Sequence, residues 1–366
     1  MKRLQSIDSF RGLMILIMVW MHLFDWWLIE PDQWFFYINY IFIDRVLGSG
    51  GFLFISGLSI TLYVRKRLKN GYNMKRLRNE YLIRTSFILT IAIGYNCLVA
   101  IGLRDPSSIW TWFLLFTLSI SMLFIWPLLK LSKVYRSVIS ITLWIVNYYL
   151  LMFLSPYQGQ LNVLGIFYHI FYNSVNLEPI LSHFSYVLIG TVIADIIFNI
   201  NNNQTHAFAK ENIKRKILYP LSLIGIILVP IGLIFEFPLS SNYATFSWKA
   251  ISLGSIFIVF SLFLAYELRN RLHFKKTYRF LYYFSYYSLT TYLGHFALFF
   301  LFSYTLPLIY ALFIILGTIL LIFVLLRSLY ITKWRDFVSI KIQLGRLAAG
   351  AAKNIERTNE KGLSEQ

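Results

Sequence analysis

Long apolar runs alternate with short polar stretches along this chain, and the alternation predicts membrane-spanning helices. A helix of about twenty apolar residues crosses the hydrocarbon core of a bilayer. The runs that meet this description cover 12–29, 47–64, 85–103, 110–129, 137–154, 181–199, 217–235, 248–266, 280–303 and 306–326. The stretch 30–46 is rich in aromatic residues such as Trp34 and Tyr37, which favour an interfacial or re-entrant segment. We therefore expect an all-α fold, a polytopic bundle of about ten transmembrane helices.

Basic residues divide unevenly between the two sides of this predicted bundle. With the N-terminus inside, only Arg45, Arg104 and Lys249 of the 34 Lys and Arg residues fall on the outer side. Short cytoplasmic loops retain basic residues. The division therefore predicts a multi-pass protein of the plasma membrane with both its N- and C-termini in the cytoplasm.

Composition narrows the range of partners. The chain is 58% hydrophobic and 14% charged, whereas about a quarter of the residues in a soluble domain are charged. Within a membrane protein, the formal charge of +18 indicates anionic lipid headgroups as partners and argues against nucleic acid. The lone Cys97 excludes a disulfide framework and a thiolate metal cluster, and we expect no metal.

Two domains follow from these patterns. Residues 1–335 form the predicted integral-membrane domain, and residues 336–366 form a polar cytoplasmic tail. A short amphipathic segment near 334–347 begins the tail, and we expect the rest of the tail to be disordered.

The first apolar run contains two ionisable residues, Arg11 and His22. On a helix they project from nearly the same face, roughly 16 Å apart along the axis. Ionisable groups at membrane depth usually face a bundle interior and indicate function. Asp8 lies three residues before Arg11 and is close enough to pair with it. The pair is either a structural ion pair at the membrane edge or, with the helix start, an anion site for a phosphate or carboxylate.

His22 is followed at i+3 by Asp25. A carboxylate beside an imidazole fixes the tautomer and supports a general base. Two other interpretations stay open: His22 is a buried histidine bonded to a neighbouring helix, or Asp25 is exposed at the outer interface.

Small residues open the second apolar run and include Ser56 and Gly57. Such residues let two helices pack closely, and they would also let a ligand pass near the backbone. Asp195 lies near the inner end of its predicted span, where snorkelling to water explains it. The remaining polar residues in or near spans are Asn96, Asn147, His183 and His295, and His295 is the next functional candidate.

Three segments together resemble a known family. They are 3–12 with Arg11, then His22, and then Phe-Leu-Phe-Ile-Ser-Gly at 52–57. This combination resembles the heparan-α-glucosaminide N-acetyltransferase catalytic-domain family, which is related to the integral-membrane acyltransferases of cell-surface sugars. The signature of those acyltransferases is an arginine, ten residues and a histidine. The segment Ser-Leu-Thr-Thr-Tyr-Leu-Gly-His at 288–295 also resembles one near the end of such chains.

The resemblance implies a transmembrane acyltransferase. It would move an acetyl or other acyl group from cytoplasmic acyl-CoA, such as acetyl-CoA, to a hydroxyl or amine of a sugar or glycan at the outer face. The catalytic residues would be His22, Asp25 and His295. The residues that bind the acyl-CoA co-substrate would be Arg11, Asp8, Ser56 and Gly57.

This chain departs from the lysosomal members of the family at one point. In those enzymes an asparagine matches His22, and the active histidine lies in the next loop. The corresponding loop here, 30–45, has no histidine, so either His22 would have to supply the chemistry or His295 would have to help.

The alternative function is a proton-coupled transporter or flippase of a lipid or sugar. Intramembrane Arg, His and Asp side chains serve proton-coupled transport equally well. The two functions differ in one requirement, because the enzyme needs a thioester donor and the transporter does not.

Overall fold

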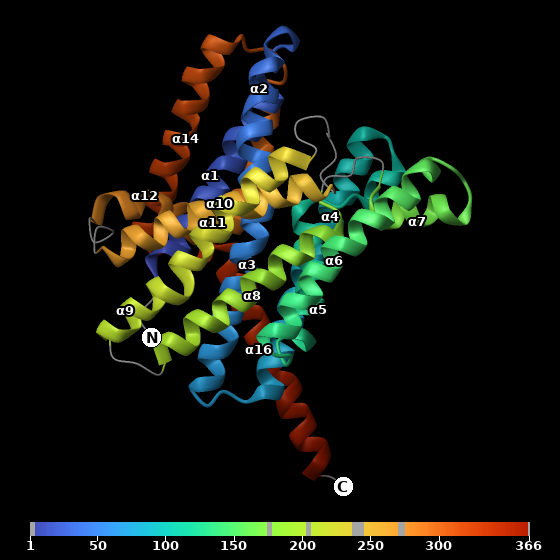
Figure 1. Cartoon of the computed structure of the whole chain (residues 1–366). Helices are drawn as coiled ribbons and strands as arrows, with labels where there is room; N and C mark the ends of the chain where they lie inside the picture. The colour runs from blue at the N-terminus through green and yellow to red at the C-terminus, as the bar shows by residue number, and fades with distance from the viewer. Residues whose placement is uncertain (1–3, 174–177, 203–205, 236–244, 270–274, 365–366) are drawn as a thin grey trace. The chain divides into compact units, whose positions relative to one another are not determined.

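The described parts of the chain are helical in the computed structural model (Figure 1). The structure describes residues 4–173, 178–202, 206–235, 245–269 and 275–364. The chain divides into two compact units. Unit 1 comprises Met1–Phe52, Lys210–Ile227 and Ser252–Gln343, and unit 2 comprises Leu53–Ala209, Leu228–Ile251 and Leu344–Gln366.

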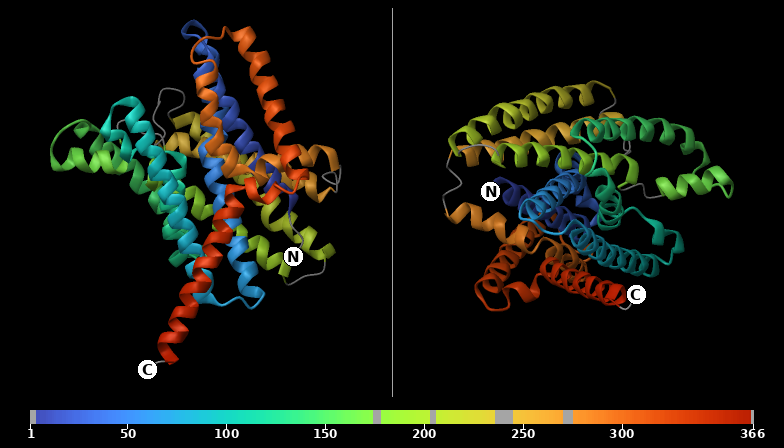
Figure 2. Two further views of the ribbon diagram at one scale, coloured as in Figure 1. Left: turned by 180° about the vertical axis from the view of Figure 1, so that it is seen from behind. Right: turned by 90° about the horizontal axis from the view of Figure 1, so that it is seen from below.

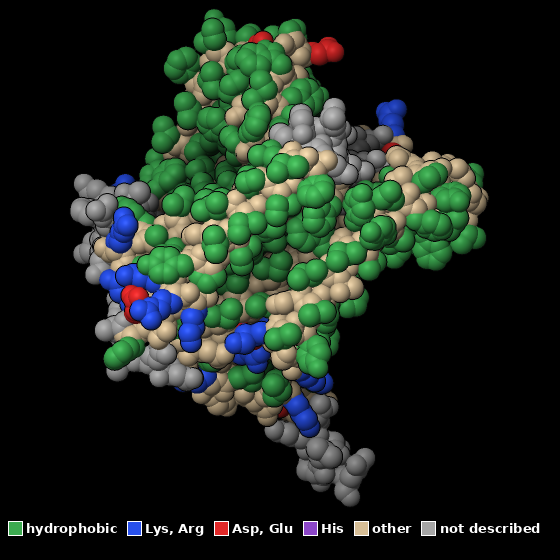
Figure 3. Space-filling view, in the orientation of Figure 1, with side chains coloured by type: hydrophobic (Ala, Val, Ile, Leu, Met, Phe, Trp, Pro, Cys, Tyr) green, Lys and Arg blue, Asp and Glu red, His purple; other side chains and the backbone are tan. Residues whose placement is uncertain are grey.

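Nine helices of the described residues are long and apolar enough to cross a membrane. They are built on α1 (Gln5–Trp27), α3 (Arg45–Lys69), α4 (Met74–Leu103), α5 (Leu114–Leu128), α6 (Lys133–Leu154), α8 (Ile180–Asn202), α10 (Tyr219–Phe235), α11 (Phe246–Leu268) and α14 (Leu308–Ile331). The spans of α5 and α10 include the helical residues before them and cover Pro106–Leu128 and Phe208–Phe235. Large apolar side chains lie on the surface, such as Phe313 on α14 at 73% exposure, and hydrophobic side chains cover much of the face in Figure 3. The predicted all-α polytopic fold is confirmed.

The remaining helices are shorter or lie at the end of the chain. They are α2 (Gln33–Asn39), α7 (Val163–Phe171), α9 (His206–Ile213), α12 (Lys275–Tyr286), α13 (Ser288–Gly294), α15 (Arg335–Val338) and α16 (Ile340–Ser364). Short 3-10 or π turns link several of them: η1 (Glu30–Asp32), η2 (Tyr40–Asp44), η3 (Pro106–Trp110), η4 (Ser155–Tyr157), η5 (Lys214–Leu218) and η7 (His295–Leu301).

The predicted span 280–303 is not one continuous helix, which corrects the sequence-based boundary. It consists of the end of α12, then α13, then the 3-10 segment η7. The break at Tyr287 leaves backbone carbonyls that other side chains satisfy. Lys341 donates to the carbonyl of Ser285 at 3.0 Å, and the Ser339 hydroxyl donates to that of Tyr286 at 3.4 Å. Irregular backbone at membrane depth is tolerated where protein groups satisfy it in this way.

Two other expectations meet different outcomes. The aromatic stretch 30–46 forms η1, α2 and η2, and it leads directly into α3. The tail, expected to be disordered beyond its amphipathic start, is helical as α16. Buried Leu344, Ala348 and Ala352 recur every four residues along α16, so its apolar stripe is longer than the sequence interpretation allowed.

Unit 1 is built around α1, which packs against α12, α13 and α14. Figures 1 and 2 show α14 beside α1 and α2. At Gly12 the backbone of α12 comes so close that an added Cβ would lie 2.0 Å from the Leu281 carbonyl oxygen. Only glycine allows this approach. At its other end, α1 receives backbone hydrogen bonds from Tyr304 and Leu306, so the segment after η7 is fixed to it.

Unit 2 packs α6 on α8, α4 on α5, and α5 on α8. The small-residue run of α3 also lies against α8. A Cβ on Gly57 would meet the Val187 carbonyl oxygen at 2.2 Å, and one on Gly190 would meet that of Phe54 at 2.2 Å. Close helix packing therefore accounts for Gly57.

Candidate functional site

The polar residues of α1 face the broken segment α12–α13–η7, which runs alongside α1 in the same direction. Three contacts follow this direction: Gly12 meets Leu281, His22 meets His295, and the Trp27 indole donates to the Leu298 carbonyl at 2.8 Å. A candidate site in unit 1 therefore has two ends, one at His22 and one at Arg11.

His22 and His295 come together at the first of these ends. Their ring centroids lie 5.0 Å apart. The Trp26 ring lies 5.0 Å from that of His22, and it stacks on His295 at 5.4 Å and 16°. His295 is 3% exposed, and His22 is half-buried. The sequence had identified both histidines as candidates, and the structure brings them together.

The hydrogen bonds of His295 define its tautomer. Nδ1 bonds the backbone carbonyl of Tyr292, and a carbonyl can only accept, so Nδ1 carries the proton in the neutral ring. Nε2 then holds the lone pair. It is buried and has no hydrogen-bond partner among the residues that the structure describes. This atom can accept a proton or a hydrogen bond.

Asp25 does not orient His22 in the way the i+3 spacing suggests. Between the two side chains there is no hydrogen bond or ion pair within the described parts of the chain. The Asp25 charge instead acts on Tyr304: burial, followed by the Asp25 and Tyr37 groups, raises the pKa of the Tyr304 phenol. The catalytic role of Asp25 stays a prediction, without a direct contact to His22 among the described residues.

The second end of the site gathers two cations around Ser285. Arg11 Nη1 lies 3.8 Å from the Asp8 carboxylate and 3.5 Å from the Ser285 hydroxyl. Lys341 Nζ donates to the Ser285 carbonyl at 3.0 Å. The expected pair of Asp8 and Arg11 is thus present. Lys341 was assigned to the polar tail, and no local pattern could place it here because it lies 56 residues from Ser285.

The start of α1 is not an open anion site. The Glu267 carboxylate of α11 accepts from the backbone N–H groups of Gln5 and Ser6, both at 2.9 Å. An acidic group of the protein already satisfies the positive end of the helix dipole. Any anion site at this end therefore depends on the side chains of Arg11 and Lys341.

Ser56 and Gly57 belong to unit 2, and the structure does not group them with the residues above. Ser56 is half-buried, and Gly57 is fully occupied in packing against α8. Their assignment to the co-substrate stays a prediction.

Lys249 lies in the first turn of α11 and is 3% exposed. Its placement with the outer-side basic residues stays a prediction. Its Nζ is 3.1 Å from His183 Nε2, and it lies 5.0 Å from the Tyr186 ring centroid. The neighbours are distant in sequence, so the spacing of residues gave no signal for this contact.

Asp195 needs correction. It was interpreted as a carboxylate snorkelling to water, yet it is 6% exposed and bonded to Arg65 and Arg136. Burial with two arginines replaces the snorkelling explanation.

Comparison with known proteins adds one match. A family model described as "Heparan-alpha-glucosaminide N-acetyltransferase, catalytic" matches residues 3–237. A comparison with curated proteins finds no match. The matched range covers more than half of the chain and includes Arg11 and His22, and it ends before His295. The family expected from the sequence is confirmed.

Proposed function

The chain belongs to the heparan-α-glucosaminide N-acetyltransferase catalytic family, and from this premise we propose which donor, acceptor and residues it uses. The donor is cytoplasmic acetyl-CoA or another acyl-CoA. The acceptor is an amine or hydroxyl of a sugar or glycan at the outer face of the plasma membrane. Both termini lie in the cytoplasm, as the distribution of basic residues favours.

The contact between His22 and His295, with ring centroids 5.0 Å apart, is the observation that carries this proposal. It supplies two imidazoles on adjacent segments of one unit, and one nitrogen, His295 Nε2, has its lone pair available. Acyl transfer to an amine or hydroxyl needs a general base of this kind.

His22 acts as the base, and His295 takes the orienting role first expected of Asp25. As the acceptor oxygen or nitrogen attacks the thioester carbonyl carbon, its proton passes to the imidazole of His22. A tetrahedral oxyanion forms and collapses, the carbon–sulfur bond breaks, and the thiolate of CoA takes the proton from His22. When the substrates bind, His295 Nε2, which has no partner among the described residues, would accept a hydrogen bond from the other nitrogen of His22 and hold that ring in the basic orientation.

The oxyanion needs hydrogen-bond donors close to the two histidines. Tyr292 is a candidate, since its ring centroid lies 5.8 Å from that of His295. Its hydroxyl would donate to the developing negative charge.

Arg11 and Lys341 hold one phosphate group of the acyl-CoA at the opposite end. Two cations that meet at Ser285 suit an extended polyanion. Arg11 and His22 are separated by three turns of α1, roughly 16 Å. The acyl-pantetheine arm of CoA is long enough to extend along such a distance.

The test uses the purified protein in nanodiscs with radiolabelled acetyl-CoA and a panel of amino- and hydroxyl-sugars. We expect transfer of label to at least one sugar. The variant His22→Ala lowers the rate by about 10²–10⁴-fold because the general base is lost. His169→Ala on α7 is the matched control, and it retains the wild-type rate. Absence of both acyl transfer and a CoA-dependent thermal shift would overturn the proposal.

A further inference from the structure

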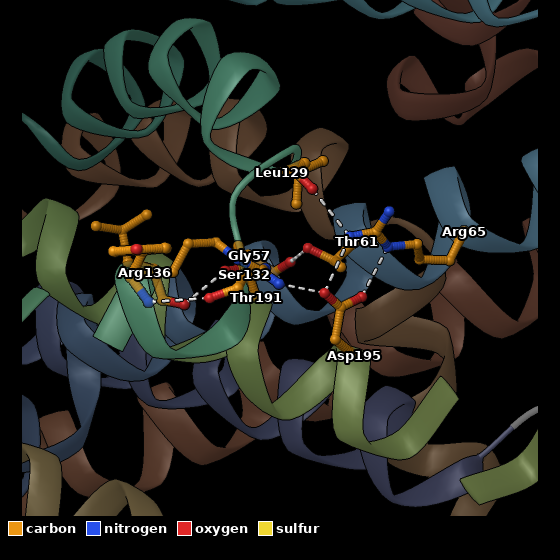
Figure 4. Close-up of polar contacts among 10 residues, drawn as sticks. Gly57, Thr61, Arg65, Leu129, Ser132, Arg136, Thr191 and Asp195 are labelled. Carbon is orange, nitrogen blue, oxygen red and sulfur yellow. Dashed lines mark hydrogen bonds and ion pairs between the residues drawn. The ribbon is translucent and has the colours of Figure 1, made fainter. Parts of the chain in front are cut away.

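A second cationic cluster lies within unit 2, where two guanidinium groups share one carboxylate (Figure 4). Arg65 Nε donates to Asp195 Oδ1 at 2.8 Å, and its Nη2 donates to Asp195 Oδ2 at 3.0 Å. The same Nη2 donates to the Leu129 carbonyl at 2.9 Å. Arg136 Nη2 makes a further bond to Asp195 Oδ2.

The cluster is short of negative charge. Two arginines and one aspartate leave a net charge of +1, since Arg stays protonated in proteins. The Arg136 side chain is only 1% exposed, and its Nε and Nη1 have no hydrogen-bond partner in the part of the chain that the structure describes. Buried donors without acceptors are costly and rare. The arrangement therefore calls for an additional acceptor.

The cluster lies at the helix ends that the charge distribution assigns to the cytoplasm. Arg65 is in the last two turns of α3, and Arg136 is in the first turn of α6. Leu129 is the C-cap residue of α5. Arg65 is 29% exposed in its side chain, so solvent reaches the cluster at this residue. Further basic residues, Lys66, Arg67, Lys130 and Lys133, adjoin it in sequence.

We propose that Arg65 and Arg136 form a binding site for a phosphate ester. The free donors of Arg136 and the exposed part of Arg65 bind the phosphate oxygens. Asp195 holds the two guanidinium groups together, so it is a positioning residue. A fork of N–H donors matches tetrahedral phosphate oxygens better than an ammonium group does. The phosphate belongs either to CoA or to an anionic phospholipid headgroup, which present the same chemistry.

The test measures ligand binding and needs no acyl transfer, so it stands apart from the test of the proposed function. The purified protein in phosphatidylcholine nanodiscs is titrated with CoA, with 3′-dephospho-CoA, with inorganic pyrophosphate, and with pantetheine as the phosphate-free probe. A second set of nanodiscs contains phosphatidylglycerol, and the thermal unfolding temperature is compared between the two lipid compositions.

The variant Arg136→Gln should weaken binding of the phosphate probe by about tenfold, in line with the loss of one charged hydrogen-bonding group. Arg215→Gln removes an equal charge from an exposed side chain that pairs with Glu211, and it should leave binding within about twofold, as expected of a surface pair. Should Arg136→Gln fail to fold, Arg136→Lys keeps the charge, loses the fork and is expected to show the same direction of change.

Asp195→Asn separates a phosphate site from a purely structural clamp. Asparagine keeps one acceptor oxygen for the two guanidinium groups and raises the charge of the cluster, so the stabilisation by the phosphate ligand should be kept or should increase. If Arg136→Gln loses binding of CoA, the phosphate at the site belongs to CoA. If Arg136→Gln loses the stabilisation by phosphatidylglycerol, the phosphate belongs to the lipid headgroup. If wild type binds no phosphate probe more tightly than pantetheine and gains no stability from phosphatidylglycerol, the proposal is wrong. It is also wrong if both responses are the same in wild type and the Arg136 variants.

Discussion

At the scale of residues, the structure redistributes roles among candidates that the sequence had already identified. His22 was expected to pair with Asp25, and it lies instead beside His295. Arg11 keeps Asp8 as a neighbour and gains Lys341 through Ser285. The sequence could identify these ionisable groups because charge in an apolar run is conspicuous. It could not identify the partners, because they lie on segments far away in the chain.

His295 is predicted to act through His22 and not through binding of the donor. His295→Gln removes the fixed Nε2 lone pair, so the rate constant kcat should fall about tenfold to a hundredfold, within the range for proton-transfer groups. The KM for acetyl-CoA should stay within twofold. Initial rates measured across acetyl-CoA concentrations give kcat and KM. Repeating the measurement at several pH values gives the pH profile of kcat. An unchanged kcat with an unchanged pH profile would contradict the assigned role.

Arg11 and Lys341 are predicted to affect the binding of acetyl-CoA and not the chemical step. Arg11→Gln or Lys341→Gln should raise the KM for acetyl-CoA about tenfold, the size expected for one charged hydrogen bond. Lys353→Gln is the control, because Lys353 is exposed on α16. A titration of acetyl-CoA in each variant gives the answer, and a drop confined to kcat would count against the assignment.

At the scale of elements, the predicted spans and the observed helices agree in most places and differ at one break and at the tail. Nine of the ten expected spans are helices of the described residues, since twenty apolar residues in sequence dictate a crossing helix. The break at Tyr287 was not foreseen. Hydropathy records how apolar a segment is, but the satisfaction of the Ser285 and Tyr286 carbonyls depends on Lys341 and Ser339. The helical tail was missed for the related reason that its apolar stripe is thin.

The contact of α1 with α12 is predicted to require glycine at position 12. Gly12→Ala would push a methyl group against the Leu281 carbonyl, and the strain should cost about 1–3 kcal/mol of unfolding free energy. Gly317→Ala on α14 is the control, because no atom lies within 4 Å of its added Cβ. Thermal unfolding in detergent compares the two variants. Equal stability would mean that α12 moves aside freely.

At the scale of the whole molecule, the sequence predicted a multi-pass helical membrane protein of this family, and both conclusions hold. The length of the apolar runs and the family motifs are local properties of the sequence, so a single sequence is enough to identify them. The division into two units was not predicted, because the units are assembled from separated segments. The burial of Lys249 was not predicted either, since a buried lysine near a helix start has the same sequence signal as a loop lysine.

The predicted orientation in the membrane places Gln158 on the outer side and Asn70 on the cytoplasmic side. Cys97 is the one cysteine of the chain, so Cys97→Ala gives a background for single-cysteine variants. An impermeant thiol reagent added to intact cells should label Gln158→Cys, and it should label Asn70→Cys only after permeabilisation. The reverse pattern would contradict the assignment of both termini to the cytoplasm.

The pairing of α1 with the late segments has a consequence for the time course of synthesis. Arg11 and its contact Ser285 are 274 residues apart. At about 5–20 residues per second, a ribosome needs about 14–55 s to make the intervening chain. During this interval α1 is in the membrane without the segment that packs on Gly12 and bonds Arg11. Nascent chains that stop before α12 should therefore be recognised as incomplete and degraded, even though most of their helices have already been inserted.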